Sequence, residues 1–293
     1  MSVDVTVTIA TWNRAELVLA CLDALARSTG IAFEVIVIDN GSTDDTRAVV
    51  RARHPAVTLI ESPTNEGYAA ANNRGIERAR GRYVLVLNND AAVEPDTLAQ
   101  MVKFMDARPA VGAAICTIYP AADAERPVPC AHRYFPSARR VLATSVLRFT
   151  GLEFLLRRLG LADRLEGRST DFTHEQRVEH ITGCFLFVRR ATIDQVGPMD
   201  PEYFLYLEET DWCYRMRRAG WEIAYTPDTR AVHLESRTTG ALPDRAEIYR
   251  RSMERFLNKH RGAVSAWIYR WQVRLIDRPL SPLFDGLRNI FRS

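Results

Sequence analysis

The sequence Tyr83-Val84-Leu85-Val86-Leu87-Asn88-Asn89-Asp90 joins five apolar residues to two amides and a carboxylate. A run this short and this apolar is typical of a strand buried on both faces, as in a parallel sheet. Ligands of open α/β sheets bind outside the carboxyl ends of the strands, so Asp90 stands where a ligand is expected. Asn and Asp are also common turn residues. Alone, this stretch therefore predicts either a ligand site or a turn.

Similar segments recur along the chain and alternate with helical patterns. Strand-like runs at residues 5–10, 34–38, 57–60, 83–87 and 111–119 are separated by helical patterns at residues 17–25, 42–53, 68–80 and 94–107. Further strands are predicted at residues 181–188, 204–207 and 221–225, with a helix at residues 208–219. This alternation predicts an α/β, Rossmann-like fold, with a mostly parallel sheet flanked by helices.

Three of the predicted strands end in polar, turn-prone residues. These ends are Thr11-Trp12-Asn13, Asp39-Asn40-Gly41-Ser42 and Asn88-Asn89-Asp90. The carboxyl ends of parallel strands lie at one edge of a sheet, so these residues are expected to gather there. The coincidence favours a ligand site at Asp90 over a simple turn.

The composition is that of an ordinary globular protein, with 47% hydrophobic and 26% charged residues among 293. No window approaches eighteen consecutive apolar residues, and the first residues lack the pattern of a secretory signal. Five scattered cysteines without a CxxC pair predict buried thiols in a reducing compartment. We therefore expect a cytoplasmic protein.

The residues at the polar edge exclude several common chemistries. A dinucleotide-binding enzyme would have G-x-G-x-x-G after the first strand, but Ala10-Thr11-Trp12-Asn13-Arg14 contains no glycine. A P-loop and a G-x-S-x-G nucleophile elbow are also absent. Amides, hydroxyls and carboxylates instead suit a nucleotide that carries a diphosphate.

Individual residues can be assigned to parts of such a ligand. Asp39 can accept hydrogen bonds from a base N–H or a ribose hydroxyl, and the backbone at Gly41 and Gly67 can approach a ligand closely. Asp90 can hold a hard divalent cation, Mg²⁺ or Mn²⁺, whose shell is completed by phosphate and water. His233, in a loop after the last strand, is a candidate further ligand.

A second acidic cluster, Glu208-Glu209-Thr210-Asp211, opens the predicted helix after residues 204–207. Acidic residues at a helix N-terminus can simply complement the helix dipole, which would also keep Glu209 ionised. Three carboxylates in four positions exceed that need, and they repel one another unless a cation or substrate shares the site. Glu208 and Asp211 are expected on one face, with Glu209 about 100° away. One of the three is a candidate general base.

These motifs, in their order, resemble those of the inverting family-2 glycosyltransferases of the GT-A fold. Thr11-Trp12-Asn13-Arg14 is similar to the first nucleotide loop, and the stretch from Val37 to Asp44 to the base-binding segment. Asn65-Glu66-Gly67-Tyr68, with the following helix to Gly75, resembles the donor-phosphate segment. Asn88-Asn89-Asp90 takes the place of the D-x-D metal motif, and Glu208-Glu209 that of the E-D motif.

The resemblance implies a role for each matching residue. It implies donor contacts by Thr11, Asn13, Arg14, Asp39, Gly41, Ser42, Asn65, Gly67, Asn72, Asn73, Arg74, Asn88 and Asn89. It implies an acceptor-side strand that starts at Thr182-Gly183-Cys184, and a base among Glu208, Glu209 and Asp211. The implied reaction is a metal-dependent transfer of a sugar from a nucleoside diphosphate to a hydroxyl of a glycan or lipid-linked acceptor.

Two residues depart from the family pattern. Asn88 replaces the first Asp of D-x-D, which leaves Asp90 as the one certain carboxylate, so the cation is expected to bind weakly without the donor. Glu209 stands where the family usually has Asp, and the choice between Glu209 and Asp211 as base stays open. Residues 204–221 resemble the rhamnosyltransferase-like branch, which implies dTDP-rhamnose as donor.

The chain divides into a catalytic domain at residues 1–240 and a tail at residues 241–293. Within the domain, residues 120–176 form a variable insertion whose apolar middle, residues 141–165, predicts a lid or surface helix, or a helix packed on its own domain. The tail has eleven Lys and Arg against five Asp and Glu, with aromatic residues between them. This helical extension is expected either to meet an anionic membrane, at its inner face, or to pack on the domain.

Two other functions compete with sugar transfer. A sugar nucleotidyltransferase would share the fold class but should carry a glycine-rich, basic loop after the first strand, which is absent. A non-catalytic carbohydrate- or nucleotide-binding relative would not need the carboxylates of residues 208–211. The basic tail could also bind nucleic acid, but no nucleic-acid-binding motif accompanies it. Nucleic acid is therefore not expected as a partner.

Overall fold

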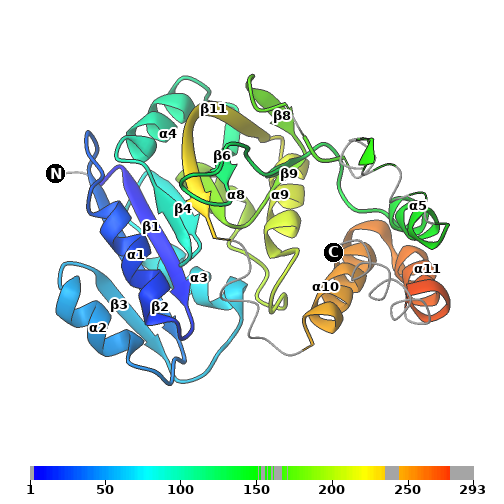
Figure 1. Cartoon of the computed structure of the whole chain (residues 1–293), viewed down its shortest axis with the longest axis horizontal. Coiled ribbons are helices and arrows are strands. Elements are labelled where there is room, and N and C mark those ends of the chain that lie inside the picture. Colours follow the sequence, from blue (N-terminus) through cyan, green and yellow to red (C-terminus); the bar gives the residue numbers. More distant parts are fainter. Residues whose placement is uncertain are drawn as a thin grey trace.

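The computed structural model describes residues 3–150, 152, 156, 158–159, 161, 167–169, 171–234 and 244–277. In these residues a large twisted sheet lies between helices, and three further helices lie together beyond one end of it (Figure 1). The chain therefore has the α/β architecture that the alternating pattern predicts.

The sheet and its helices have the following bounds. The strands of the main sheet are β1 (Val5–Thr11), β2 (Phe33–Asn40), β3 (Thr58–Ser62), β4 (Tyr83–Leu87), β5 (Ala91–Val93), β6 (Val111–Tyr119), β8 (Gln176–Val178), β10 (Phe185–Arg189) and β11 (Glu222–His233). The helices are α1 (Ala15–Leu25), α2 (Thr46–Arg53), α3 (Tyr68–Arg78), α4 (Thr97–Asp106), α5 (Ala138–Phe149), α8 (Arg190–Val196), α9 (Glu208–Arg218), α10 (Arg245–Arg261) and α11 (Ala263–Gln272), which a π-helical turn, Val273–Asp277, continues. β7 (Ala131–His132) and β9 (His180–Ile181) form a small second sheet.

The strand order of the main sheet is β3-β2-β1-β4-β10-β6-β11-β5, and β8 also pairs with β11. β1, β2, β3 and β4 are parallel, whereas β10 runs antiparallel between β4 and β6. The sheet is thus mostly parallel, as predicted. Because β10 is reversed, Phe185 at its start pairs with Leu87 at the end of β4. This pairing brings the segment before β10 to the polar edge.

Helices cover both faces of the sheet because successive side chains of a buried strand point to opposite sides. Val5, Val7 and Ile9 of β1 share a core cluster with Val18 and Leu22 of α1. On the other face, Gly75 of α3 lies so close to Thr8 and Ile38 that a Cβ would be 2.9 Å from each side chain. Strands buried on both faces explain the near-continuous apolar runs in the sequence.

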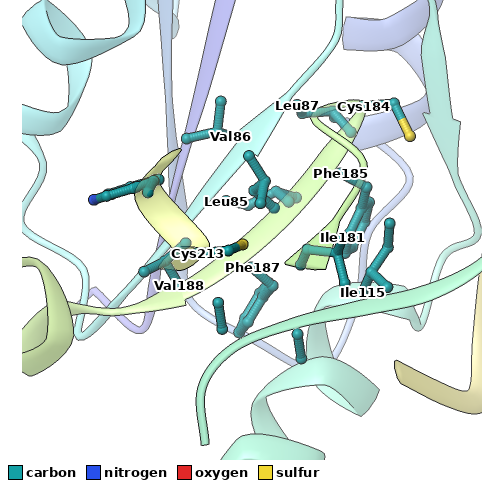
Figure 2. Close-up of a cluster of buried hydrophobic side chains, with 14 of the residues drawn as sticks. Leu85, Val86, Leu87, Ile115, Ile181, Cys184, Phe185, Phe187, Val188 and Cys213 are labelled. Carbon is teal, nitrogen blue, oxygen red and sulfur yellow. The ribbon is translucent and has the colours of Figure 1, made fainter. Parts of the chain in front are cut away.

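The centre of the core lies where β4, β10 and β6 meet. Figure 2 shows Leu85, Val86 and Leu87 packed with Phe185, Phe187, Val188, Ile115, Ile181, Cys184 and Cys213. The five cysteines are all buried, and none forms a disulfide. The prediction of buried thiols is therefore confirmed.

Three predicted strands differ in the structure. The strand predicted at residues 181–188 is split, because β9 ends at Ile181 in the small sheet and β10 begins at Phe185 in the main sheet. Residues 204–207 form a turn rather than a strand, because Tyr206 and Leu207 have φ of 70° and 64°, a left-handed conformation that strands exclude. The last strand does not stop at residue 225 but continues to His233, since its second half pairs with β6 and with the unpredicted strand β5. His233 is therefore held by a strand and does not lie in a loop.

Helix α2 also begins later than the Ser42 spacing predicts. It starts at Thr46, where Asp44 accepts hydrogen bonds from the backbone N–H (3.1 Å) and the hydroxyl (2.5 Å) of Thr46. Ser42 instead links the loop after β2 to the loop after β1, because its Oγ accepts a hydrogen bond from the backbone N–H of Asn13 at 2.8 Å.

The predicted helical extension is present through residue 277, and α10 packs on the sheet domain through buried Phe256 and Leu257. Ser252 of α10 donates to the carbonyl of Leu205 at 2.8 Å. α11 packs against α5, where Gln272 donates to Ser145 Oγ at 2.6 Å. Of the helix predicted at residues 141–165, the part to Phe149 belongs to α5, and most of the rest lies outside the described residues. Among the described residues, no helix has the length and apolar content needed to cross a membrane.

Candidate active site

A cleft of about 620 Å³ opens at the edge of the sheet where β1 and β4 end and β10 begins. The predicted site residues that line it are Thr11, Asn65, Gly67, Asn88, Asn89, Asp90, Thr182, Gly183, Cys184, Glu208, Glu209 and His233. The polar strand ends meet there, since Asn89 Nδ2 donates to Thr11 Oγ1 at 3.0 Å. The structure thus brings the motif after β4 and the acidic start of α9 to one cavity.

One corner of the cleft is built by Asp90 and His233. The pairing of β5 with β11 sets His233 opposite Ala91, so His233 Nε2 lies 3.1 Å from Asp90 Oδ1. Asn88 Nδ2 lies 3.1 Å from the same nitrogen, and an amide N–H₂ can only donate. Nε2 of a neutral imidazole has one lone pair, so a cation bound there would replace the hydrogen bond from Asn88, with Asp90 Oδ1 beside it as a second ligand.

The donor set at this corner fits a divalent cation that brings part of its own shell. Asp90 Oδ1 is buried and makes no hydrogen bond within the described part of the chain. No group of three or more His, Cys, Asp or Glu that could hold a metal occurs among the described residues. Two protein ligands, with the rest supplied by diphosphate and water, is a usual arrangement for Mg²⁺.

The opposite group of carboxylates comes from the first turn of α9. Glu208 is 4% exposed, and its Oε2 has no hydrogen-bond partner among the described residues. Burial and the charge of Glu209 raise the pKa of Glu208 well above its usual range, and burial raises the pKa of Glu209. Burial therefore outweighs the helix dipole that was expected to favour the ionised form.

Two neighbours define the space around Glu209. A Cβ on Gly183 would lie 3.7 Å from the Glu209 side chain, so the missing side chain keeps this carboxylate accessible. The Tyr68 hydroxyl lies 2.9 Å from both Asn88 Oδ1 and the carbonyl oxygen of Gly183, and it can donate its one proton to either. Burial, followed by the charge of Glu208, raises the pKa of Tyr68 well above its usual value, so the hydroxyl stays a donor.

Asp211 does not line the cleft, which corrects its candidacy as the base. Its fully buried carboxylate contacts Arg215 at 2.9 Å, Lys259 at 2.8 Å and His260 at 2.7 Å. Burial by itself would raise the pKa of Asp211, but hydrogen bonds from these three groups outweigh it and hold the pKa well below its usual range. Glu208 and Asp211 were expected on one face of α9. Helix α10 covers the part of that face that holds Asp211, whereas Glu208 lines the cleft. Asp211 therefore joins α9 to the tail.

The loops after β1 and β2 are held to each other beside the cleft. Asn13 Oδ1 accepts a hydrogen bond from the backbone N–H of Thr43 at 2.8 Å. Asn13 and Arg14 have φ of 56° and 63°, and the Arg14 side chain is exposed. Asn13, Arg14 and Ser42 do not line the cleft; Asn13 and Ser42 instead shape the loop that places Thr11.

Asp39 also lies beside the cleft rather than in its lining. Its Oδ1 accepts from Arg47 Nε at 2.6 Å and from the backbone N–H of Ser42 at 3.1 Å. Its Oδ2 is buried and has no hydrogen-bond partner among the described residues. The next residue, Asn40, does line the cleft and binds Asn65 Oδ1 at 2.9 Å.

At the two glycines of the predicted nucleotide loops, the space that a Cβ would need is filled by other residues of this protein. Gly41 and Gly67 have φ of 81° and 89°. A Cβ would lie 2.6 Å from the Thr64 carbonyl carbon at Gly41, and 2.5 Å from the Phe204 carbonyl oxygen at Gly67. The expectation that both glycines let a ligand approach is therefore corrected for Gly41, whereas Gly67 also lines the cleft.

The three predicted donor contacts on α3 do not line the cleft. Asn72 donates to the carbonyl of Tyr68 at 3.1 Å, and Asn73 bonds both the carbonyl (2.8 Å) and the N–H (3.1 Å) of Met199. Arg74 forms a bidentate pair with Glu66, at 2.9 and 2.6 Å. These side chains are bonded to other groups of the protein, and the assignment of Asn72, Asn73 and Arg74 to the donor stays a prediction.

Sequence reasoning missed several residues of the lining, namely Trp12, Asn40, Tyr68, Arg168 and Arg245. The first three stand inside the quoted motifs, so their position next to assigned residues was an available signal. Arg168 comes from the insertion and Arg245 from the start of α10, and neither lies in a local pattern. Only the tertiary fold brings these two arginines to the cleft.

The chain matches one family model and is similar in sequence to two named bacterial proteins. The family model "Glycosyl transferase family 2" matches residues 6–195. An N-acetylglucosaminyl-diphospho-decaprenol L-rhamnosyltransferase of Mycobacterium tuberculosis is 29% identical over 233 residues, which cover 76% of this chain and 73% of that protein. The succinoglycan biosynthesis protein ExoO of Rhizobium meliloti is 39% identical over 105 residues, 36% of this chain and 30% of the relative.

Solved structures share the fold. The mannosyltransferase PcManGT of Pyrobaculum calidifontis, in complex with GDP-Man and Mn²⁺, superposes with a TM-score of 0.54 at 22% identity, over 95% of this chain and 67% of that chain. Residues 1–349 of S. aureus TarS, in complex with UDP-GlcNAc, give a TM-score of 0.56 at 17% identity, over 87% and 67%. Since the family model covers well over half of the chain, the protein is a glycosyltransferase and belongs to glycosyl transferase family 2.

Proposed function

We propose that this glycosyltransferase moves a sugar from a nucleoside diphosphate to a hydroxyl of a lipid-linked saccharide, with inversion at the anomeric carbon. One observation carries the proposal: a single cleft holds both the Asp90–His233 corner and the carboxylates of Glu208 and Glu209. The first group suits the charged diphosphate of the donor, and the second suits the attacking hydroxyl. Family membership disfavours the sugar nucleotidyltransferase alternative.

In the proposed mechanism Glu209 is the general base. Its carboxylate accepts the proton of the acceptor hydroxyl while that oxygen forms a bond to the anomeric carbon. The bond from that carbon to the diphosphate oxygen breaks in the same step, and the nucleoside diphosphate leaves with the electron pair. Gly183 leaves room for the acceptor beside Glu209. One displacement inverts the configuration.

Asp90 and His233 would hold a Mg²⁺ or Mn²⁺ ion together with the donor diphosphate. When bound, the cation acts as a Lewis acid that stabilises the leaving diphosphate. Asn88 fixes the His233 ring, and Asn89 ties this loop to Thr11. Asp39, with its unpartnered Oδ2, is the proposed contact to the base or ribose.

For the substrates, we propose dTDP-rhamnose as the donor and a diphosphate-linked saccharide on a polyprenol as the acceptor. Support comes from the Mycobacterium tuberculosis relative, whose name describes rhamnosyl transfer to N-acetylglucosaminyl-diphospho-decaprenol. Such an acceptor is embedded in a membrane, so the protein would work in the cytoplasm at the inner face of the cell membrane. The basic tail is the proposed region of contact with that surface.

A donor screen tests this proposal. The purified chain is mixed with Mn²⁺ and dTDP-rhamnose, UDP-sugars or GDP-sugars, and both thermal shift and transfer to a short-chain lipid-linked acceptor are measured. Stabilisation and transfer with dTDP-rhamnose support the assignment. Transfer from another donor alone contradicts the sugar, and binding without transfer or hydrolysis of any donor supports the non-catalytic alternative.

A matched pair of variants tests the metal corner. Asp90→Ala should abolish most metal-dependent transfer and leave the melting temperature within a few degrees of that of the unchanged chain. Asp96→Ala, which changes an acidic residue just before α4, is the control. Full activity of Asp90→Ala, with Mn²⁺ titrated, contradicts the metal assignment.

A further inference from the structure

The α11 helix and its continuation expose an apolar stripe on the side opposite their packed face. Ala266, Tyr269, Gln272 and Val273 are buried, whereas Val264, Trp267, Trp271 and Leu275 are 72%, 53%, 45% and 64% exposed. The spacing of three and four residues places these four exposed side chains on one face of the helix. Helices of water-soluble domains normally turn such a stripe inward. On α11 and its continuation the stripe is instead exposed.

Helix α5, which packs against α11, also exposes apolar side chains. Gln272 of α11 donates to Ser145 Oγ at 2.6 Å and to the carbonyl of Val141 at 3.3 Å, which joins the two helices. On α5, Leu142 and Val146 are 37% and 44% exposed and lie one turn apart. In Figure 1 α5, α10 and α11 lie together at one end of the molecule, away from β1 to β3. We call the exposed residues of α5 and α11 the α5–α11 surface.

The charge of this surface has one sign. Among residues 138–147 and 263–275 the charged side chains are Arg139, Arg140, Arg270 and Arg274, with no Asp or Glu. Arg270 is paired with Glu254 of α10 at 2.6 Å, while Arg139 and Arg274 are exposed. Tryptophan and arginine beside aliphatic side chains are typical of segments that lie in the interface of an anionic bilayer.

Basic residues of α10, unlike the exposed arginines of α5 and α11, form ion pairs with the sheet domain. Arg255 pairs with Glu202 and Asp200, and Lys259 lies 2.7 Å from Asp200. Phe256 of the same helix is fully buried. The charge excess of the tail is therefore partly neutralised by the domain, and the α5–α11 surface is where exposed arginines and exposed tryptophans occur together.

We propose that the α5–α11 surface docks the protein on a membrane that contains anionic lipids, with Trp267 and Trp271 in the interfacial layer. A second copy of the chain is the other candidate occupant. Self-association would bring two sets of arginines together without a carboxylate in either segment, so charge complementarity favours the lipid. The inference needs no catalytic activity, and it extends the proposed function by assigning membrane contact to part of the insertion as well as to the tail.

Vesicle sedimentation of the full chain tests the proposal. Vesicles of phosphatidylcholine and phosphatidylglycerol in equal amounts are compared with pure phosphatidylcholine. The unchanged protein should sediment with the first and much less with the second. Replacing both Trp267→Ser and Trp271→Ser should lower partitioning at least about tenfold, with an unchanged melting temperature because both side chains are exposed.

A charge-matched comparison separates the surface from net charge. The double variant Arg139→Gln with Arg274→Gln should lose about fivefold in partitioning for each arginine. The control, Arg27→Gln with Arg78→Gln, removes the same charge from exposed positions near α1 and on α3 and should bind like the unchanged chain.

Three outcomes would overturn the proposal: no sedimentation of the unchanged chain with anionic vesicles, equal loss in the two charge variants, or a dimer in light scattering that the tryptophan variant abolishes. The last outcome would assign the surface to self-association. Because sedimentation requires no turnover, these results are independent of whether the proposed donor and acceptor are correct.

Discussion

Exchanging Asp211 for asparagine tests how the acidic cluster of α9 is divided between structure and chemistry. Asp211 is fully buried and receives Arg215 from its own helix and Lys259 and His260 from α10. Asparagine has the same shape but no charge, so it keeps a hydrogen bond and removes the carboxylate that pairs with Arg215, whereas Lys259 still has Asp200 at 2.7 Å. We expect Asp211→Asn to lose stability and to retain turnover.

The size of the loss follows from the burial of the group. Removing one partner of a buried ion pair costs about 3–5 kcal/mol. The side chains of Arg215 and Lys259 are 22% and 34% exposed, so water recovers part of the loss and the lower end, about 3 kcal/mol, is expected. For a chain of this size about 2–4 °C is lost per kcal/mol, which gives a drop of about 6–12 °C in melting temperature.

The pH dependence of this loss has a defined sign. Because the folded-state pKa of Asp211 is held below its ordinary value, its contribution is fully present above the pKa of an unfolded aspartate, about 3.9. The contribution is lost as the pH falls below that value. The stability difference between the unchanged chain and Asp211→Asn should therefore be constant near neutral pH and shrink in acid.

The assay compares Asp211→Asn with Glu209→Gln by thermal denaturation and by kcat with saturating donor. Glu209→Gln should melt close to the unchanged chain, bind donor normally and lose turnover by at least about a hundredfold. Asp23→Asn, which weakens a pair with the exposed Arg53 side chain, is the control and should cost less than about 1 kcal/mol. An Asp211→Asn protein that keeps its melting temperature but loses turnover would refute the reasoning.

Three further predictions follow from the cleft. Because burial raises the pKa of Glu209, the base is protonated and inactive at higher pH than an ordinary glutamate; a profile of kcat/KM against pH should fall, on the acid side, clearly above pH 4.3. His233→Ala should raise the half-saturating Mn²⁺ concentration by at least about tenfold, measured by titrating donor hydrolysis, and an unchanged value would remove His233 from the metal corner. Gly67→Ala should lose about 1–3 kcal/mol, because its φ is positive and its Cβ would meet Phe204, and a denaturant titration that shows equal stability would contradict this packing.

Local sequence was sufficient for the features that depend on one element at a time. The apolar run of Tyr83–Leu87 predicted a strand buried on both faces, and the polar residues after it predicted a site at the carboxyl edge, where Asp90 lies. Alternation along the chain predicted the mostly parallel sheet. The predictions of the strand and of the sheet hold because side-chain periodicity and the shared direction of parallel strands are properties of short segments.

Residues that look equivalent in the sequence were separated only by packing. Glu208, Glu209 and Asp211 occur within four positions, yet α10 covers Asp211 and leaves the two glutamates facing the cleft. In the same way Asn73 sits in a donor-like motif but is used to bind Met199, more than a hundred residues away in the sequence. A local pattern cannot show which distant element will occupy a given face.

The amino-acid sequence by itself determined the class of fold, the edge at which the site lies and the kind of ligand that its polar groups suit. The tertiary structure decided which carboxylate faces the cleft, that His233 joins Asp90, and that α11, packed against α5, exposes two tryptophans. The reason is physical. Periodicity fixes the direction of a side chain relative to its own helix or strand, whereas long-range packing fixes what lies in that direction.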